Sequence, residues 1–147
     1  GAGPLPSEDA ALSQKLPDAR NGMHPWQQNF RAGWLDLVLL RYAAEVVGRL
    51  DGLAVTCLDR LAELPDIQIC RAYRNGPLQI ERIIPATEAQ DLPYQAQITA
   101  ALARCRPQLE PILSPEDLFS TLIKHLNTSI IITSYGLTAN DKTIQPH

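Results

Sequence analysis

The sequence predicts an α/β fold with a partial sheet, flanking helices and a β-hairpin. A short apolar run, LAVTCL at 53–58, lies between turn signals, as the buried strands of parallel sheets do. Two alternating stretches at 67–73 and 78–84 flank Asn75-Gly76, a pattern typical of a hairpin. Helical patterns precede and follow these strands, and this alternation indicates an α/β domain.

Composition narrows the classes of partner. The 147 residues carry 13 basic and 16 acidic side chains, a net charge of −3, so no nucleic-acid partner is expected. No apolar run approaches the roughly 18 residues that span a bilayer, so no membrane partner is expected. Three widely spaced cysteines without a C-x-x-C pair favour reduced thiols and a cytoplasmic location over disulfides or zinc.

The elements follow in order along one expected domain, 1–147. Residues 1–32 form a loop-rich segment in which Ser7 caps a short helix that Pro17 ends. G-A-G-P at 1–4 is a turn rather than a phosphate loop, because no strand precedes it and Lys15 comes too late.

An α/β core is expected over 33–147. In the helix at 34–50, apolar residues cover most of the circumference and leave one stripe, Arg41, Glu45 and Arg49. This pattern predicts a helix that is buried on most sides with a single salt-bridged edge.

The second half begins with the hairpin and continues into a less regular stretch. Residues 94–105 are alanine-rich and predict a helix, followed by a break at Pro107 and Pro111. Ser114-Pro115 is a strong helix start, and that helix runs to about Leu126. A third buried strand is expected at 129–134.

Asp59 is the one candidate site residue that spacing alone provides. It follows the 53–58 strand, and ligands of open α/β sheets bind at the carboxyl ends of strands. Its carboxylate can accept two hydrogen bonds from guanine, or it can cap the short helix at 59–64, and both interpretations stay open. His24, His125 and His147 are scattered without metal-ligand spacing, so no metal site is expected.

Five strings, taken together, resemble the adenylosuccinate synthetase family in order and spacing. The family's patterns are G-x-G-P-F-P-T-E, R-x-G-W-[LF]-D, T-K-L-D-V-L, [VI]-x-[LI]-C-x-A-Y and I-x-S-T-G-P-D-R-x-x-T-I. Their counterparts here are GAGPLPSE (1–8), RAGWLD (31–36), LAVTCLDRL (53–61), IQICRAYR (67–74) and IIITSYGLTANDKTI (130–144).

The resemblance implies a partial sheet of that family's P-loop-NTPase-like fold. The family joins IMP and L-aspartate at the expense of GTP, with Mg²⁺, in purine biosynthesis. Its glycine-rich phosphate loop and its acid–base residues belong to an amino-terminal region that the resemblance does not cover. No catalytic residue, no metal site and no cofactor bound by this chain are therefore expected.

Four positions of this sequence match positions that lie at the guanine base in the family. Asp59 stands where the aspartate of the family's T-K-L-D binds guanine, and Cys57 replaces the lysine that covers the base. Thr133 and Ser134 match the serine-threonine pair near guanine, although the G-P-D-R that follows has become Y-G-L-T.

The loop that receives aspartate and IMP is more altered. The family's T-T-G-R-P-R-R appears as PWQQNFR at 25–31, so Gln28 and Phe30 stand where arginines clamp the substrate. Phenylalanine supplies neither charge nor the fork that a carboxylate favours. Arg31 alone is retained, and a structural role is also open to it.

Three hypotheses follow from this pattern. The first is a truncated, catalytically incomplete domain, a pseudoenzyme that binds GTP or GDP weakly or binds a protein partner. The second is an active ligase half that a separate amino-terminal chain completes. The third is a module for interaction or self-association, because an apolar surface that the rest of the enzyme would cover favours oligomers.

Overall fold

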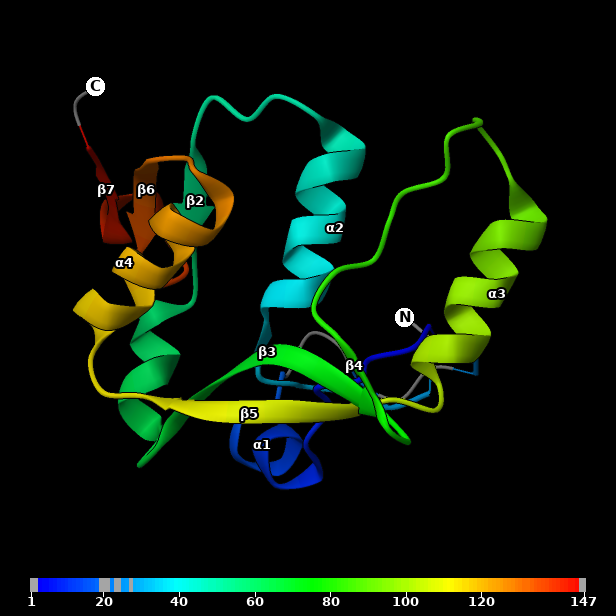
Figure 1. Cartoon of the computed structure of the whole chain (residues 1–147). Helices are drawn as coiled ribbons and strands as arrows, with labels where there is room; N and C mark the ends of the chain where they lie inside the picture. Colours follow the sequence, from blue (N-terminus) through cyan, green and yellow to red (C-terminus); the bar gives the residue numbers. More distant parts are fainter. Residues whose placement is uncertain (1–2, 19–21, 23–24, 27, 146–147) are drawn as a thin grey trace.

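Two separate sheets organise the protein (Figure 1). The computed structural model describes residues 3–18, 22, 25–26 and 28–145. In chain order the elements are α1 (Ala10–Lys15), β1 (Leu35–Asp36), α2 (Leu37–Val47), β2 (Leu53–Val55), the 3-10 helix η1 (Leu58–Glu63), β3 (Ile67–Asn75), β4 (Leu78–Ile80), α3 (Leu92–Leu102), β5 (Arg106–Ile112), α4 (Pro115–Leu126), β6 (Ile130–Ser134), the 3-10 helix η2 (Ala139–Asp141) and β7 (Lys142–Ile144).

The first sheet is built around β3. The short strand β1 runs parallel to it, with Leu35 opposite Ile69, and β4 returns antiparallel from the turn after Asn75. This confirms the hairpin, although β4 ends at Ile80 and not at residue 84. The strand β5 pairs antiparallel with β3 over 67–74.

The sequence pattern missed β5. Pro107 and Pro111 indicated a break, yet both lie inside the strand. Among the described residues β5 pairs with β3 alone, so it is an edge strand, where a residue without an N–H group is tolerated. The two prolines are four residues apart and share one side of the backbone, which is the unpaired side.

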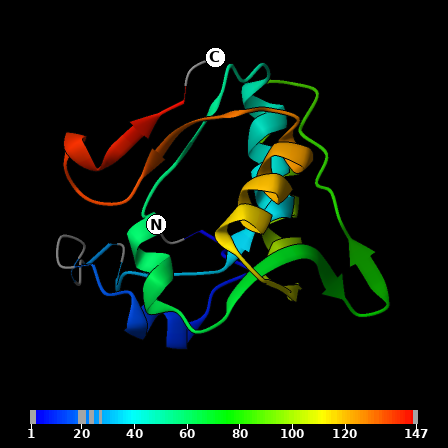
Figure 2. The same cartoon turned by 90° about the vertical axis from the view of Figure 1, so that its left-hand side faces the viewer.

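The second sheet contains β2, β6 and β7. The strands β2 and β6 are parallel, as expected of the 53–58 run, and β7 pairs antiparallel with β6. The expected burial is wrong for β2, which is only three residues long with Ala54 exposed between two half-buried neighbours. The strand β7 had no sequence signal, since its three residues are all exposed. Figure 2 shows this sheet to one side of α4, with η1 and α1 below it.

Local capping explains where the helices begin. The prediction for the first helix is wrong in detail, because Asp9 and not Ser7 is the N-cap, accepting from the Leu12 N–H at 3.0 Å. Ser7 is instead almost fully buried. The prediction for α4 is confirmed, with Ser114 as N-cap and Pro115 in the first turn. The helix expected at 94–105 begins earlier, at Leu92, and ends at Leu102.

The expected salt-bridged stripe on α2 is wrong. Arg41 contacts His125 and Glu45 pairs with Arg82, both outside the helix. Arg49 is not part of the helix, which spans 37–47 and not 34–50 as expected, and it pairs with Asp51. The helix is also less buried than expected, because only Leu37 and Val38 at its start are fully buried. Val46 and Val47 near its end are 59% and 69% exposed.

The core lies between the first sheet and α2. Asp36 ends β1 and caps α2, with Oδ1 accepting from the N–H groups of Val38 and Leu39. Its other oxygen accepts a 2.8 Å hydrogen bond from the hydroxyl of the fully buried Tyr73. One buried carboxylate therefore fixes the start of the helix against the central strand, and burial of the phenol together with this bond raises the pKa of Tyr73.

Candidate functional site

The carboxyl ends of β2 and β6 meet at one edge of the second sheet. Val55 lies opposite Thr133 in the parallel register, so the segment after β2 and the segment after β6 leave the sheet side by side. The helix η1, which carries Asp59, contacts β6. The fold thus brings together the two stretches from which the four expected guanine contacts come.

Cys57 lies in the turn between β2 and η1. Its backbone is left-handed, with φ 61° and ψ 29°, a conformation that costs a non-glycine residue roughly 1 kcal/mol or more. The residue is exposed and its thiol is free. Strained residues concentrate at ligand-binding turns, so the conformation agrees with a site here without identifying a ligand.

Asp59 lies in the first turn of η1 and is exposed. The N-cap of η1 is Cys57, so the interpretation of Asp59 as the helix cap is wrong. Within the described part of the chain, no hydrogen bond or ion pair engages the Asp59 carboxylate. Both of its oxygens are therefore available to a ligand.

Thr133 and Ser134 are the two buried polar residues of the second sheet. They are 5% and 3% exposed, and the Ser134 hydroxyl donates to the Gly136 carbonyl at 3.1 Å. That hydroxyl therefore stabilises the turn after β6 rather than facing the surface.

The loop after β6 closes upon itself. The Asp141 carboxylate accepts from both the N–H and the hydroxyl of Thr138 at 2.7 Å, and these bonds lower the pKa of Asp141. A Cβ on Gly136 would lie 2.7 Å from that carboxylate, so the turn requires glycine there. The acid nearest the Thr133–Ser134 pair in this loop is thus committed to the loop's own structure.

A mostly apolar pocket of about 360 Å³ lies between α1, η1 and α4. Phe30 and Cys57 both line it, so residues expected in the aspartate loop and in the guanine site share one cavity. Its size falls within the range of small-molecule sites. Asp59, Thr133, Ser134, Gln28 and Arg31 are not part of its wall.

No sequence pattern pointed to the polar residues of the pocket, which are Asp18, Thr56, Arg60 and Gln68. Arg60 belongs to η1, and its Nη2 donates to the Pro17 carbonyl at 3.4 Å. Thr56 is the neighbour of Cys57 in the sequence, and this position was the one signal that could have identified it. Gln68 belongs to the alternating stretch at 67–73, which indicates a strand and no binding role. Their convergence depends on tertiary packing, which no local pattern reveals.

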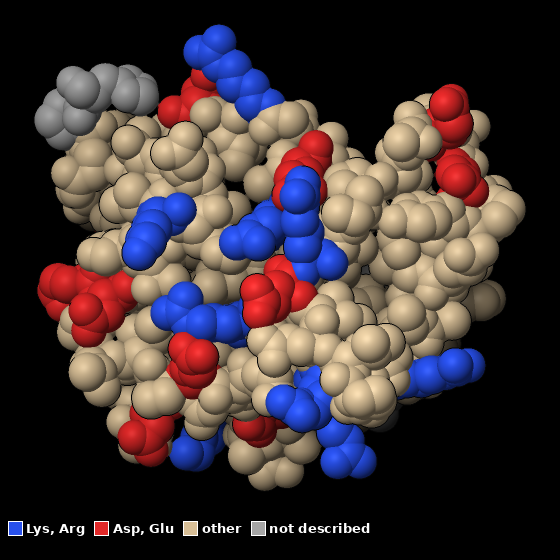
Figure 3. Space-filling view, in the orientation of Figure 1, with Lys and Arg blue, Asp and Glu red and all other residues tan. Residues whose placement is uncertain are grey.

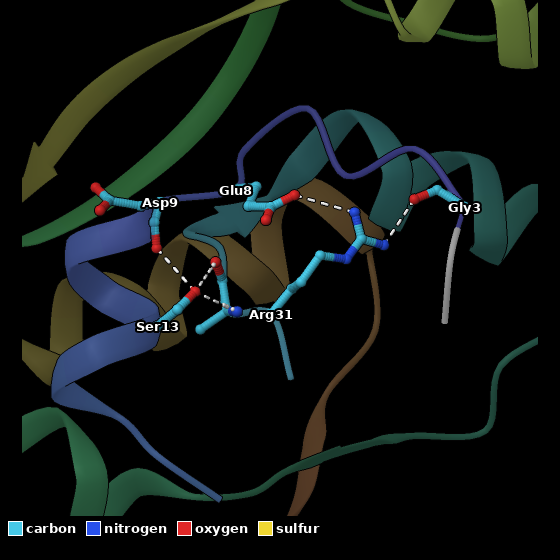
Figure 4. A network of polar contacts seen from close by, with 6 residues as sticks. Gly3, Glu8, Asp9, Ser13 and Arg31 are labelled. Carbon is cyan, nitrogen blue, oxygen red and sulfur yellow. Dashed lines mark hydrogen bonds and ion pairs between the residues drawn. The ribbon is translucent and has the colours of Figure 1, made fainter. Parts of the chain in front are cut away.

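Arg31 has a structural role in the network shown in Figure 4. Its guanidinium contacts Glu8 at 3.0 Å and donates to the Gly3 carbonyl at 2.7 Å. The segment around it is held in the same way, because the Ser13 hydroxyl bonds to both the N–H and the carbonyl of Ala32. These contacts tie the expected aspartate loop to residues 3–13.

The neighbouring Gly33 is required by close packing. A Cβ there would lie 2.8 Å from the Ser7 carbonyl oxygen, to which the Trp34 N–H donates. The Trp34 ring also donates to Asp9 at 3.0 Å. Gln28, by contrast, is exposed with a positive φ of 57°.

The histidines, the cysteines and the lengths of the helices bear on metal binding, disulfides and membrane spans. His24 and His147 lie outside the described residues, and within the described ones no three His, Cys, Asp or Glu side chains are grouped to hold a metal ion. All three cysteines are free. No helix in the described ranges is long and apolar enough to cross a bilayer.

Comparison of sequences gives a consistent set of relatives. A family model described as adenylosuccinate synthetase matches residues 1–127, which leaves Thr133 and Ser134 outside the match. Adenylosuccinate synthetase of Synechococcus sp. (strain RCC307) is 37% identical over 115 residues, 76% of this chain and 23% of that protein. That of Sorangium cellulosum is 45% identical over 76 residues, 50% of this chain and 17% of that protein. The chain spans less than a quarter of the length of these curated relatives.

Comparison of structures confirms the expected fold. Fully ligated adenylosuccinate synthetase from Plasmodium falciparum superimposes with a TM-score of 0.71 over 99% of this chain and 37% of that one. At 19% identity this likeness establishes the fold alone.

Proposed function

The chain belongs to the adenylosuccinate synthetase family, and from this we propose that these residues bind a guanine nucleotide weakly through Asp59 without completing the family's reaction themselves. The observation that carries the proposal is an exposed carboxylate, engaged by no described residue, at the end of a parallel strand. Guanine presents an N1–H and an exocyclic amine side by side, and a carboxylate can accept from both.

The surroundings of Asp59 support weak rather than tight binding. Cys57 replaces the lysine whose stem covers the base in the family pattern, and the hydroxyl of Ser134 is already bonded within its own turn. The base would therefore gain two hydrogen bonds from one carboxylate and little stacking. Each hydrogen bond to a charged group contributes about 1.5–3 kcal/mol net, so two of them correspond to a dissociation constant of roughly 6 mM to 40 μM.

Incomplete chemistry is the second part of the proposal. The family's reaction needs Mg²⁺ and a phosphate-binding loop, and the described residues offer no grouped set of metal ligands. The carboxylates and other possible ligands among the described residues do not form a site for Mg²⁺, so we propose no catalytic step for these residues.

Aspartate binding is also not expected. Arg31 is the only arginine left in the altered loop, and its guanidinium already contacts Glu8 and Gly3. Phe30, in place of another arginine, lines the apolar pocket.

Thermal unfolding with nucleotides tests the proposal. We expect GDP to raise the melting temperature, IDP and IMP (whose shared base lacks the exocyclic amine) to raise it less, and ADP and aspartate to leave it unchanged. A ligand at 100 times its dissociation constant adds about 2.7 kcal/mol. Asp59→Asn should abolish the GDP effect, whereas Asp66→Asn, the same change at an exposed aspartate before β3, should preserve it. Equal GDP shifts in the two variants, or no GDP shift in the unmodified chain, would refute the assignment.

A second candidate function, association with another chain, rests on exposed apolar side chains in and beside the second sheet. Leu137, in the loop after β6, is 80% exposed, and Ile144 of β7 is 75% exposed. Such side chains are covered in a chain that pairs with a copy of itself or with a separate amino-terminal half. Light scattering decides between association and a monomer, and turnover upon mixing with a chain that carries the glycine-rich loop would show that the halves complete one ligase.

A further inference from the structure

A second groove lies on a different face of α4 from the apolar pocket. Leu118 and Leu122 line the pocket, whereas Ser120, Thr121 and Lys124 line a hollow of about 590 Å³ between α4, α2 and the end of β5. Two further hollows of about 410 Å³ each adjoin it, and all three share Arg41 and His125. In the face drawn in Figure 3, lysine and arginine side chains gather toward the middle with acidic ones beside them.

The chemistry of His125 fixes the direction of its two hydrogen bonds. Its Nε2 lies 2.8 Å from the Leu37 carbonyl, which can only accept, so Nε2 carries the hydrogen. Its Nδ1 lies 3.1 Å from Arg41 Nη2, a donor, so Nδ1 accepts. The ring is therefore neutral. Burial, followed by the charges of Arg41 and Arg71, accordingly lowers the pKa of His125.

Arg41 consequently has a positive charge with a neutral partner. No carboxylate among the described residues pairs with it, although it is partly buried between α2 and α4. Lys124 likewise has no carboxylate partner within the described part of the chain. Arg71 differs, because Glu110 lies 2.6 Å from its Nε. Lys124 is exposed, whereas Arg41 is a partly buried cation without a counter-charge, which is unusual because burial penalises an unpaired charge.

The main hollow combines these charges with hydroxyl donors. Arg41, Arg71 and Lys124 line it with a single carboxylate, Asp117. Ser120 and Thr121 add hydroxyl groups from the face of α4 that bears Lys124. Guanidinium, ammonium and hydroxyl donors around one hollow are the groups that recognise a phosphate.

We propose that this groove binds the phosphate group of a small phosphorylated molecule through Arg41 and Lys124. The hollow is larger than a phosphate ion, so it has room for the carbon skeleton or second phosphate attached to it. A nucleic acid does not fit, because Glu45, Glu81 and Glu110 line the adjoining hollows and would repel a continuous polyanion. The groove and the guanine proposal are independent, since Asp59 lines none of these hollows.

Amide chemical shifts of the intact chain test this proposal with inorganic phosphate and pyrophosphate as probes. Ionic strength is held constant with chloride. We expect saturable shifts confined to residues 117–125 and the neighbourhood of Arg41 and Arg71, with pyrophosphate binding more tightly than phosphate. Shifts that do not saturate, or that scatter over the surface, would overturn the proposal.

Variants identify the groups that hold the anion. Lys124→Gln should weaken pyrophosphate binding about tenfold, and Arg41→Gln at least as much. The matched control is Lys15→Gln, the same change on α1, which Figure 1 places on the other side of the first sheet. Lys124 is exposed, so its variant keeps the fold if the Arg41 variant does not. Affinity equal to the control in Lys124→Gln would refute the site, and Asp59→Asn should leave pyrophosphate binding unchanged.

Discussion

The two sheets differ in what they bury. Around the first sheet, Ile69, Cys70 and Tyr73 of β3 have no exposed surface and pack with the start of α2. In the second sheet, β2 and β7 have no buried residue, and β6 buries only Thr133 and Ser134. The first sheet is packed like the interior of a larger protein, whereas the second offers strand ends and loops to its surroundings. The buried contacts that stabilise the chain therefore lie around the first sheet, and the residues proposed to contact a ligand lie in and after the second.

The largest expected difference is in thiol reactivity. Cys70 is fully buried, and burial followed by the charge of Asp36 raises the pKa of its thiol to about 12, whereas Cys57 is exposed. We expect an alkylating reagent to label Cys57 at least about a thousandfold faster, because Cys70 reacts only after the first sheet opens. Mass spectrometry of labelled peptides measures both rates. In urea the two rates should converge, and rates within tenfold of each other in the native chain would contradict the contrast.

Truncating one isoleucine in each sheet compares the packing directly. Ile69→Ala removes side-chain atoms that have no exposed surface, so a cost of about 4 kcal/mol is expected in urea unfolding. Ile132→Ala, at a half-buried position of β6, should cost about 1 kcal/mol. If the two variants lost equal stability, the second sheet would be as tightly packed as the first.

The buried polar groups provide the next comparison. Asp36→Ala removes both the cap of α2 and the partner of Tyr73, so we expect a loss of about 3 kcal/mol. The exposed Asp66→Ala should change the free energy of unfolding by less than about 0.5 kcal/mol. Thr133→Val tests the second sheet, and we expect a cost below about 1 kcal/mol, because no bond from its hydroxyl to a described residue supports the fold. A larger loss for Thr133→Val than for Asp36→Ala would reverse the ranking.

The smallest effect concerns pH at the contact between α2 and α4. The folded state lowers the pKa of His125, so the unfolded state takes up the proton first as pH falls. The contribution of the neutral ring is complete above about pH 6.5 and is lost below it, by less than about 1 kcal/mol. Unfolding of the unmodified chain and of His125→Gln should therefore differ in slope between pH 6.5 and 5. Parallel profiles would indicate that His125 titrates equally in both states.

Local signals explain most of what the sequence predicted. Ser114-Pro115 specifies a helix start through neighbouring atoms alone, and the structure confirms it. The break predicted at Pro107 and Pro111 is wrong, because a strand tolerates prolines at the edge of a sheet. Whether β5 lies at an edge is a property of the whole sheet. The salt-bridged edge predicted for α2 is also wrong because of tertiary packing, since Glu45 and Arg41 contact Arg82 and His125 from distant segments.

The candidate site was predictable only in part. Asp59 was expected at the end of a strand, and it is exposed there as a ligand contact requires. That Phe30 and Cys57 would share a pocket could not be read from the sequence, because it depends on how α1 and η1 pack together. Whether Asp59, Cys57, Thr133 and Ser134 contact guanine remains a prediction, for which the GDP experiment is the test.

The prolines of β5 have a consequence for the behaviour of the chain in concentrated solution. An open strand edge is a template on which another chain can add a strand, and repeated addition produces fibrils. Pro107 and Pro111 remove two donors from the outer side of this seven-residue strand, so an incoming backbone cannot form a continuous ladder there. Replacing both prolines would complete that row of donors, and the longest open edge among the described strands would then be the place where aggregation begins.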